Sequence, residues 1–207
     1  MTSGDESAVA VDGTLASGAP AAVPQPSALA PAARRDRSAP ITEPELAEAE
    51  AAYARLVAAP YGLTTAPPSP RMAIDKIVDQ IRNATRIARE VADAAAPAAA
   101  GPLPLLLSAL TLQADAYDFL AGHIASAHVP LPPGIAVQAL AQTAPTHAQL
   151  QAQFEARIRE TMASQLGEIY CIAVARYERV LELDPADPRA ADQLAAYGEA
   201  FVRSCGQ

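Results

Sequence analysis

Apolar side chains recur at helical spacing through most of the chain after about residue 40. The clearest stretch is 71–95, where apolar residues stand three and four positions apart, close to the period of an α-helix. The same spacing predicts four further helices over 43–59, 103–127, 148–184 and 187–204, and a short helix over 135–142. Prolines and glycines separate these stretches, so we expect an all-α fold, an antiparallel bundle of helical hairpins.

Local signals mark where some of these helices begin and end. Thr42-Glu43-Pro44-Glu45 has the form of a capping box, which predicts that Thr42 is the N-cap of the first helix. Thr146 is expected to cap the long helix 148–184, and Gly167 is the expected place for a bend in it. The prolines of Asp184-Pro185-Ala186-Asp187-Pro188 end that helix, since proline cannot continue it.

The first 40 residues differ in composition from the rest. They are rich in Ala, Pro, Ser and Gly and contain almost no large apolar side chain. Such a segment buries too little surface to offset the entropy of ordering it. We therefore divide the chain into a disordered Ala/Pro-rich leader, 1–40, and a helical domain, 41–207.

Composition and charge narrow the classes of function. Hydrophobic residues make up 51% of the chain, much of it alanine, whereas aromatic residues are 4% and Trp is absent. This composition suits close-packed helices and argues against a β-sandwich or barrel. A net charge of −8 argues against nucleic-acid binding. We expect no membrane insertion, because no apolar run is long enough. An acidic start without a signal peptide favours the cytoplasm, although the cell envelope stays open.

A repeat-like pattern lies near the C-terminus. It begins with a small residue, Ala173, and an aromatic residue follows four positions later, Tyr177. An apolar residue comes three positions after that, Val180, and a proline five positions further, Pro185. This spacing resembles helix B of a tetratricopeptide repeat (TPR). Leu194 then stands where the next repeat's first helix would have an apolar residue. The preceding helix A does not match the repeat pattern, so the resemblance covers the C-terminal part only.

Two further features together resemble the C-terminal end of repeat proteins from large bacterial cell-envelope and motility assemblies. The first is the string from Ala114 to Ala121, Ala-x-x-Tyr-x-x-Leu-Ala, followed by the Val-Pro-Leu-Pro-Pro break at 129–133. The second is the long helix that ends in the Asp184-Pro185 turn. Both resemblances imply a scaffold that binds other proteins.

Three arginines are the main candidate for partner contact. Arg82, Arg86 and Arg89 are four and three residues apart, which places them on one side of a helix. Guanidinium groups in such a row are able to bind carboxylates of a partner through paired hydrogen bonds. The alternative is a solvated helix face in which these arginines pair with Asp75 and Asp79.

The two cysteines leave a choice open. Cys171 and Cys205 form a disulfide if the last helix folds back, which would indicate an oxidising compartment. The simpler interpretation is two unpaired thiols, with Cys171 buried and Cys205 at a frayed end. Tyr170 and Tyr177 are interpreted as packing residues.

Candidate catalytic and metal-binding patterns are weak in this chain. His123 and His128 are five residues apart, whereas two histidines that bind one metal from a helix are four residues apart. We interpret these two residues and His147 as exposed or helix-end histidines. We expect no metal, no cofactor and no enzyme activity. The leading hypothesis is a protein–protein interaction scaffold or adaptor that binds a helix or peptide between its helices. The alternative is a structural subunit that self-assembles through helix 148–184.

Overall fold

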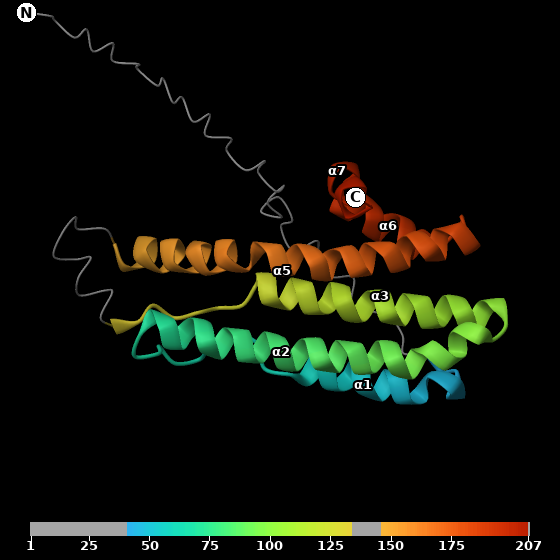
Figure 1. The fold of residues 1–207 in the computed structure, drawn as a ribbon, viewed down its shortest axis with the longest axis horizontal. Coiled ribbons are helices and arrows are strands. Elements are labelled where there is room, and N and C mark those ends of the chain that lie inside the picture. The colour runs from blue at the N-terminus through green and yellow to red at the C-terminus, as the bar shows by residue number, and fades with distance from the viewer. Residues whose placement is uncertain (1–40, 134–145, 207) are drawn as a thin grey trace, which may run out of the picture.

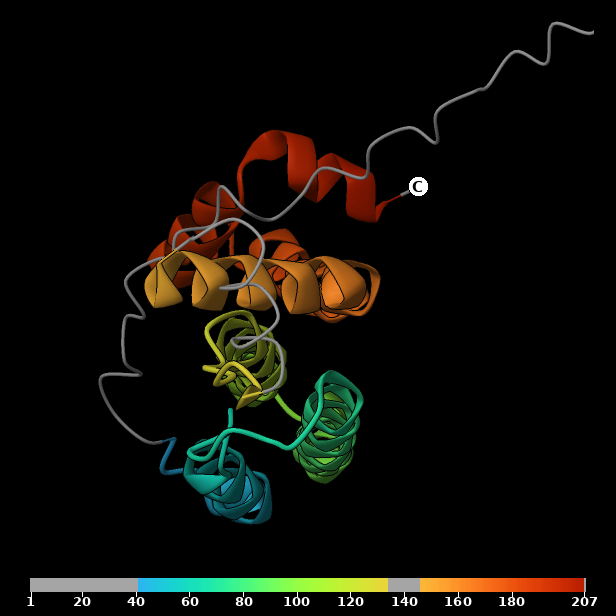
Figure 2. The same cartoon turned by 90° about the vertical axis from the view of Figure 1, so that its left-hand side faces the viewer.

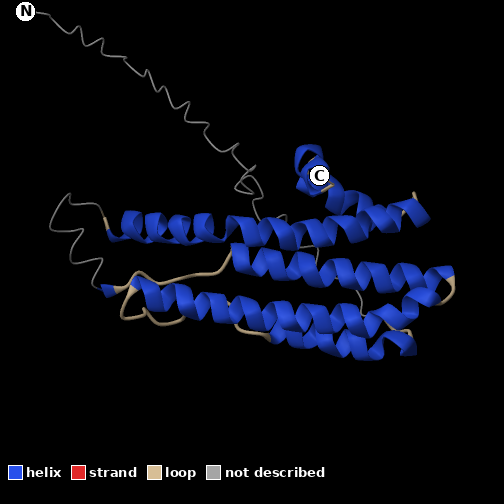
Figure 3. Cartoon of the chain, viewed as in Figure 1, coloured by secondary structure: helices blue, strands red, loops and turns tan. Residues whose placement is uncertain are grey.

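Every regular element in the described part of the chain is a helix (Figure 3). The structure, a computed structural model, describes residues 41–133 and 146–206. The α-helices are α1 (Ala47–Ala58), α2 (Pro70–Ala95), α3 (Leu103–Ala125), α5 (His147–Leu183), α6 (Pro188–Tyr197) and α7 (Glu199–Cys205), and the short 3-10 helices are η2 (Pro44–Leu46) and η3 (Ala96–Ala100). The all-α prediction is confirmed. The predicted leader 1–40 and the predicted helix 135–142 lie outside the described residues.

The helices stack in layers around α3 (Figures 1 and 2). The α1–α2 pair lies on one side of α3 and the long helix α5 lies on the other, with α6 and α7 packed on α5. Consecutive long helices run antiparallel (Figure 1). None of the helices described is apolar enough over a sufficient length to cross a membrane.

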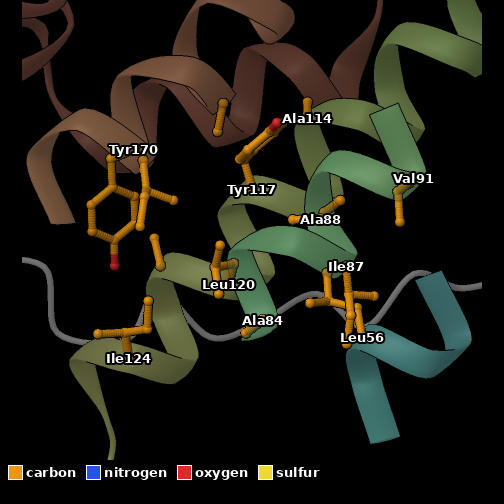
Figure 4. Close-up of a cluster of buried hydrophobic side chains, with 14 of the residues drawn as sticks. Leu56, Ala84, Ile87, Ala88, Val91, Ala114, Tyr117, Leu120, Ile124 and Tyr170 are labelled. Atoms are coloured by element: carbon orange, nitrogen blue, oxygen red, sulfur yellow. The ribbon is translucent and has the colours of Figure 1, made fainter. Parts of the chain in front are cut away.

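Alanines let the layers approach closely. In α3 the fully buried small residues are Ala109, Ala114, Ala116 and Ala121, and α2 contributes others such as Ala84 and Ala88. Larger side chains fill the space between them: Leu56 of α1, Ile87 and Val91 of α2, Leu120 and Ile124 of α3 and Tyr170 of α5 meet in one cluster (Figure 4). A small residue facing a large one gives the dense packing of a protein interior.

The helix starts follow the capping signals in part. Thr146 caps α5 with a complete capping box: its hydroxyl accepts from the Gln149 N–H, and the Gln149 side-chain oxygen accepts from the Thr146 N–H. The predicted cap at Thr42 is wrong: α1 is preceded by the 3-10 turn η2, and no side chain caps either element. The nearby acids make tertiary contacts instead. Glu43 accepts a hydrogen bond from Ser108 of α3 at 3.1 Å, and Glu50 accepts one from the backbone of Ile41 at 2.7 Å.

The C-terminal helix is broken in two. The predicted single helix 187–204 is wrong because Gly198 adopts φ +79°, a left-handed conformation that interrupts the helix between α6 and α7. This break turns α7 back onto α5. Cys205 thereby reaches Cys171, and the two form a disulfide with their Cα atoms 5.1 Å apart. The interpretation as unpaired thiols is wrong, since it assumed that Cys205 stays at a frayed end.

Glutamine side chains hold the loops at one end of the bundle. Gln80 of α2 donates to the carbonyl of Gly62 and accepts from its N–H, both at 3.0 Å. Gln151 of α5 makes the equivalent pair with Val129 and Leu131, at 2.7 Å each. The two loops touch where the N–H of Leu63 donates to the carbonyl of His128 at 2.8 Å. Side-chain amides thus satisfy backbone groups that no helix or sheet can pair.

We predict opposite effects from two Gly→Ala substitutions. Gly62 has φ +82°, and a Cβ there would lie 2.7 Å from the His128 carbonyl oxygen, so Gly62→Ala should destabilise the fold by about 1–3 kcal/mol. Gly167 is the matched control: it lies inside α5 with nothing within 4 Å of an added Cβ. Gly167→Ala should stabilise by about 0.5–1 kcal/mol. Urea unfolding measures both, and equal effects would contradict the loop packing described above.

The disulfide predicts a difference between reduced and oxidised protein. It closes a loop over a sequence separation of 34. In the chain-entropy picture, Cys171→Ser/Cys205→Ser should lower the free energy of unfolding by about 4 kcal/mol. Reductant should lower wild-type stability to the level of this variant and leave the variant itself unchanged. A polyethylene-glycol maleimide added to denatured, unreduced wild type should modify neither cysteine; modification of both would exclude the bond.

Candidate functional site

The predicted arginine row, Arg82, Arg86 and Arg89, lies exposed along one face of α2. Local pairing explains part of the row. Arg82 lies 3.4 Å from Asp79, and Arg86 contacts Glu90 and, at 2.9 Å, Asn83. Asp79 was an expected partner, whereas Asp75 makes no ion pair with any described residue. Exposed pairs of this kind contribute little to stability and leave the charges open to water.

The row continues onto the neighbouring helix. Arg55 of α1 lies 3.0 Å from Glu90, the same carboxylate that Arg86 contacts. The Glu90 carboxylate therefore pairs with two guanidinium groups, those of Arg55 on α1 and Arg86 on α2. Arg89 makes no hydrogen bond or ion pair with any residue that the structure describes. The basic groups on this face thus exceed the acids that pair with them.

The residues of the repeat-like pattern lie mostly in the core. Ala173, Tyr177 and Val180 are buried on one side of α5, Leu194 is half-buried on α6, and Pro185 is exposed in the turn between the two helices. Three of the five residues are therefore buried in the core, whereas Pro185 ends α5 without being buried. The TPR resemblance itself stays a prediction, because α5 is one continuous helix of 37 residues and α6 is only 10 residues long.

A buried polar network joins three helices through α3. The Asp115 carboxylate, only 4% exposed, accepts a hydrogen bond from the Tyr177 hydroxyl of α5 at 2.9 Å. Its other oxygen lies 2.6 Å from the Arg189 guanidinium of α6. One turn further along α3, Asp118 accepts a hydrogen bond from the Tyr197 hydroxyl, also of α6. Each buried charge therefore meets a donor, as burial in low dielectric demands.

The two tyrosines of this network stay protonated. Burial raises the pKa of the Tyr177 hydroxyl, and the Asp115 carboxylate beside it raises that pKa further. Burial and the Asp118 carboxylate do the same to the pKa of Tyr197. Both hydroxyls therefore act as hydrogen-bond donors across the neutral range, which suits a structural network and gives neither tyrosine a reason to act as a base.

Aromatic rings pack beside the disulfide. The Tyr170 ring of α5 meets the Tyr197 ring of α6 edge-on at 5.6 Å and the Phe201 ring of α7 at 6.1 Å. The prediction that Tyr170 and Tyr177 are packing residues is confirmed, since both are buried. The disulfide and this aromatic cluster together fix the two short C-terminal helices on α5.

The Glu155 carboxylate of α5 anchors the loop that follows α3. One of its oxygens accepts from His128 Nδ1 at 2.8 Å, from the Val129 N–H at 3.3 Å and from the Gln151 amide at 2.9 Å. Burial by itself raises the pKa of Glu155, but these hydrogen bonds and the nearby His128 outweigh burial and hold the pKa below its ordinary 4.5. The charged form of Glu155 is therefore the form that the fold stabilises.

The histidines take three different places. His147 is the exposed first residue of α5, and His128 is an exposed partner of Glu155. His123 lies in the last turn of α3, at a helix end as expected, and its half-buried ring stacks on Tyr61 with ring centroids 4.4 Å apart. Within the described residues, no three His, Cys, Asp or Glu side chains come together as a metal site would require.

Sequence reasoning missed the network around Asp115 and Asp118. The only signal was two carboxylates, three residues apart, in the predicted helix 103–127, which contains no other Asp, Glu, Lys or Arg. Acids at this spacing share a helix face. Whether that face points to water or to the core depends on how many neighbours surround the helix, which the α3 sequence does not state.

Comparison of the chain with protein-family models, with curated proteins and with solved structures finds no match in any of the three.

We predict that Arg189 is required for the Asp115 site. Replacing it by Gln leaves a buried carboxylate without its counter-charge, which should lower the free energy of unfolding by about 2–4 kcal/mol. Arg179 of α5 is the matched control, since it pairs with Glu182 at 2.5 Å on the surface. Arg179→Gln should change stability by less than about 0.5 kcal/mol. Thermal and urea unfolding compare the two variants, and equal losses would contradict the role assigned to Arg189.

Glu155 should make stability depend on pH. Its pKa is lower in the folded than in the unfolded chain, so its contribution is present above about pH 4.5 and is lost as pH falls through the folded value. Glu155→Gln should be destabilised by about 1–2 kcal/mol at neutral pH. The difference from wild type should shrink below pH 4.5. Glu160→Gln, at an exposed position of α5, should show no such convergence. A pH-independent gap for Glu155→Gln would refute the assignment.

Proposed function

We propose that this protein is a non-enzymatic scaffold or adaptor that binds a partner protein through the arginine row. One observation carries the proposal: Arg82, Arg86 and Arg89 stand exposed in a single row on a helix whose other side is packed in the core. Guanidinium groups held at fixed spacing recognise carboxylates well, because each offers several donors in a planar fork.

The rigidity of the body supports this proposal. α2 is packed against α1 and α3 by apolar side chains, and α3 in turn is tied to α5 and α6 through Asp115 and Asp118. A rigid helix presents its side chains with little loss of entropy on binding, which favours recognition by preorganisation. The buried carboxylate of Asp115 and its neighbour Asp118 are also occupied by Tyr177, Arg189 and Tyr197, which fits a structural role better than a chemical one.

The disulfide bears on where the scaffold works. Disulfides persist mainly in oxidising compartments, such as the extracellular space and the bacterial periplasm. The Cys171–Cys205 bond therefore supports a place in the cell envelope rather than the cytoplasm that the first residues suggested. A part in a larger bacterial envelope or motility assembly is consistent with this placement.

The alternative function, self-assembly through 148–184, has less support. The exposed side of α5 is largely polar, and Ile172, at 39%, is the only large apolar residue of α5 that is exposed within its described side chains. Stable obligate interfaces usually have an apolar centre. Light scattering over a range of concentrations tests the alternative, because self-assembly through α5 would raise the mean mass with concentration.

Crosslinked capture from the native cell tests the scaffold proposal. Arg82→Gln/Arg86→Gln/Arg89→Gln should lose the proteins that wild type recovers, since the contacts to their carboxylates are removed. Arg157→Gln/Arg159→Gln is the control, because these two exposed arginines lie on α5, away from the row. It should recover the same proteins as wild type. Identical recovery by all three proteins would reject the arginine row as the contact surface.

A further inference from the structure

Tyr117 of α3 differs from the other core tyrosines in its polar group. Its side chain is buried, with 7% of the residue exposed, yet its hydroxyl makes no hydrogen bond with any residue that the structure describes. Buried tyrosine hydroxyls normally find a partner, as those of Tyr177 and Tyr197 do. Among the described residues, every side-chain nitrogen or oxygen that is completely shut off from solvent has a hydrogen-bond partner. The Tyr117 hydroxyl is therefore not completely shut off from solvent.

Two hydrogen bonds fix which residues lie level with this hydroxyl. The Gln113 amide of α3 donates to the Ala92 carbonyl of α2 at 3.0 Å, which sets the register of these antiparallel helices. The Tyr177–Asp115 bond sets the register of α3 against α5. Arg89 precedes Ala92 by three residues on α2, and Arg176 precedes Tyr177 by one residue on α5. Because both helices run antiparallel to α3, Arg89 and Arg176 both lie level with residue 116. Figure 4 shows the Tyr117 hydroxyl directed toward the Ala114 end of α3, and so toward that level.

Both arginines at this level are exposed and without an ion pair to any described residue. Burial raises the pKa of Tyr117, whereas the charges of Arg89 and Arg176 act to lower it and that of Asp93 to raise it. All three charged groups therefore lie within electrostatic reach of the hydroxyl. Two positive groups and one negative group leave a net positive charge around an unpartnered donor.

We propose that Arg89, Tyr117 and Arg176 form a binding site for the carboxylates of an acidic peptide segment in the partner protein. This inference rests on the proposed function and extends it from the row on α2 to a second helix. Each guanidinium donates to a carboxylate oxygen, and the tyrosine hydroxyl supplies a third donor between them. The chain's net charge of −8 disfavours nucleic acid and other extended polyanions, while a short peptide contacts the local positive charge alone.

Fluorescence anisotropy of a labelled hexaglutamate amide, at low salt, tests the site in the full chain. Arg89→Gln and Arg176→Gln should each weaken binding about tenfold, because each removes charge-assisted hydrogen bonds. Tyr117→Phe should weaken it about threefold, the effect of one neutral hydrogen bond, while keeping the ring packed. Arg157→Gln, on α5 beyond the end of α3, is the charge-matched control and should stay within about twofold of wild type. Circular dichroism checks that each variant is folded.

Three outcomes would overturn the inference. The first is that wild type does not bind the peptide even at a protein concentration of about 1 mM, because a specific site should have a dissociation constant below this value. The second is equal weakening by Arg157→Gln, which would indicate a diffuse charge effect. The third is weakening by Arg82→Gln/Arg86→Gln with none from Arg176→Gln or Tyr117→Phe. That third result would reject this site but would leave the proposed function intact. The proposed function is tested separately by the capture experiment, which does not use the peptide.

Discussion

The enclosure of α3 between two layers of helices is the constraint from which most of this structure follows. A helix surrounded in this way needs small residues where its neighbours approach closely, and its buried carboxylates and amides need hydrogen-bond partners inside the protein. Alanines meet the first demand. The second is met by Gln113, which donates to the carbonyl of Ala92, and by Asp115 and Asp118, which accept from tyrosines of α5 and α6. The polar groups of α3 thereby determine which helices can pack on it, and in what register.

The loops at one end of the bundle and the short helices on the outer side of α5 are stabilised by different interactions. At one end Gln80, Gln151 and Glu155 bind the backbone of two loops that contain no regular structure. At the other side of α5, a disulfide and three aromatic rings hold two helices too short to be stable alone. Both devices add order where the hydrophobic core is thin, which is common in a chain with much alanine and few aromatic residues.

Buried polar residues hold the helices together and surface arginines are free to contact a partner, which links the fold to the proposed function. Asp115 and Asp118 are engaged with Tyr177 and Tyr197, while the arginines of α2 and α5 remain at the surface on rigid helices. Recognition by such a surface depends on fixed spacing of charges, so the packing that holds α2, α3 and α5 in register also determines what the arginines can bind. Arg89 and Arg176, far apart in sequence, are brought to one level only by that register.

The sequence alone determined the helices and the face on which the arginine row lies, because apolar periodicity and proline placement act over a few residues. It also determined the Thr146 cap. It did not determine the first turn, where Glu43 and Glu50 bind other elements, or the break at Gly198, or the pairing of Cys171 with Cys205. The surroundings of Asp115 and Tyr117 were equally hidden. Each of these depends on which residues from distant segments become neighbours, and local spacing carries no information on distances between helices; only their packing decides them.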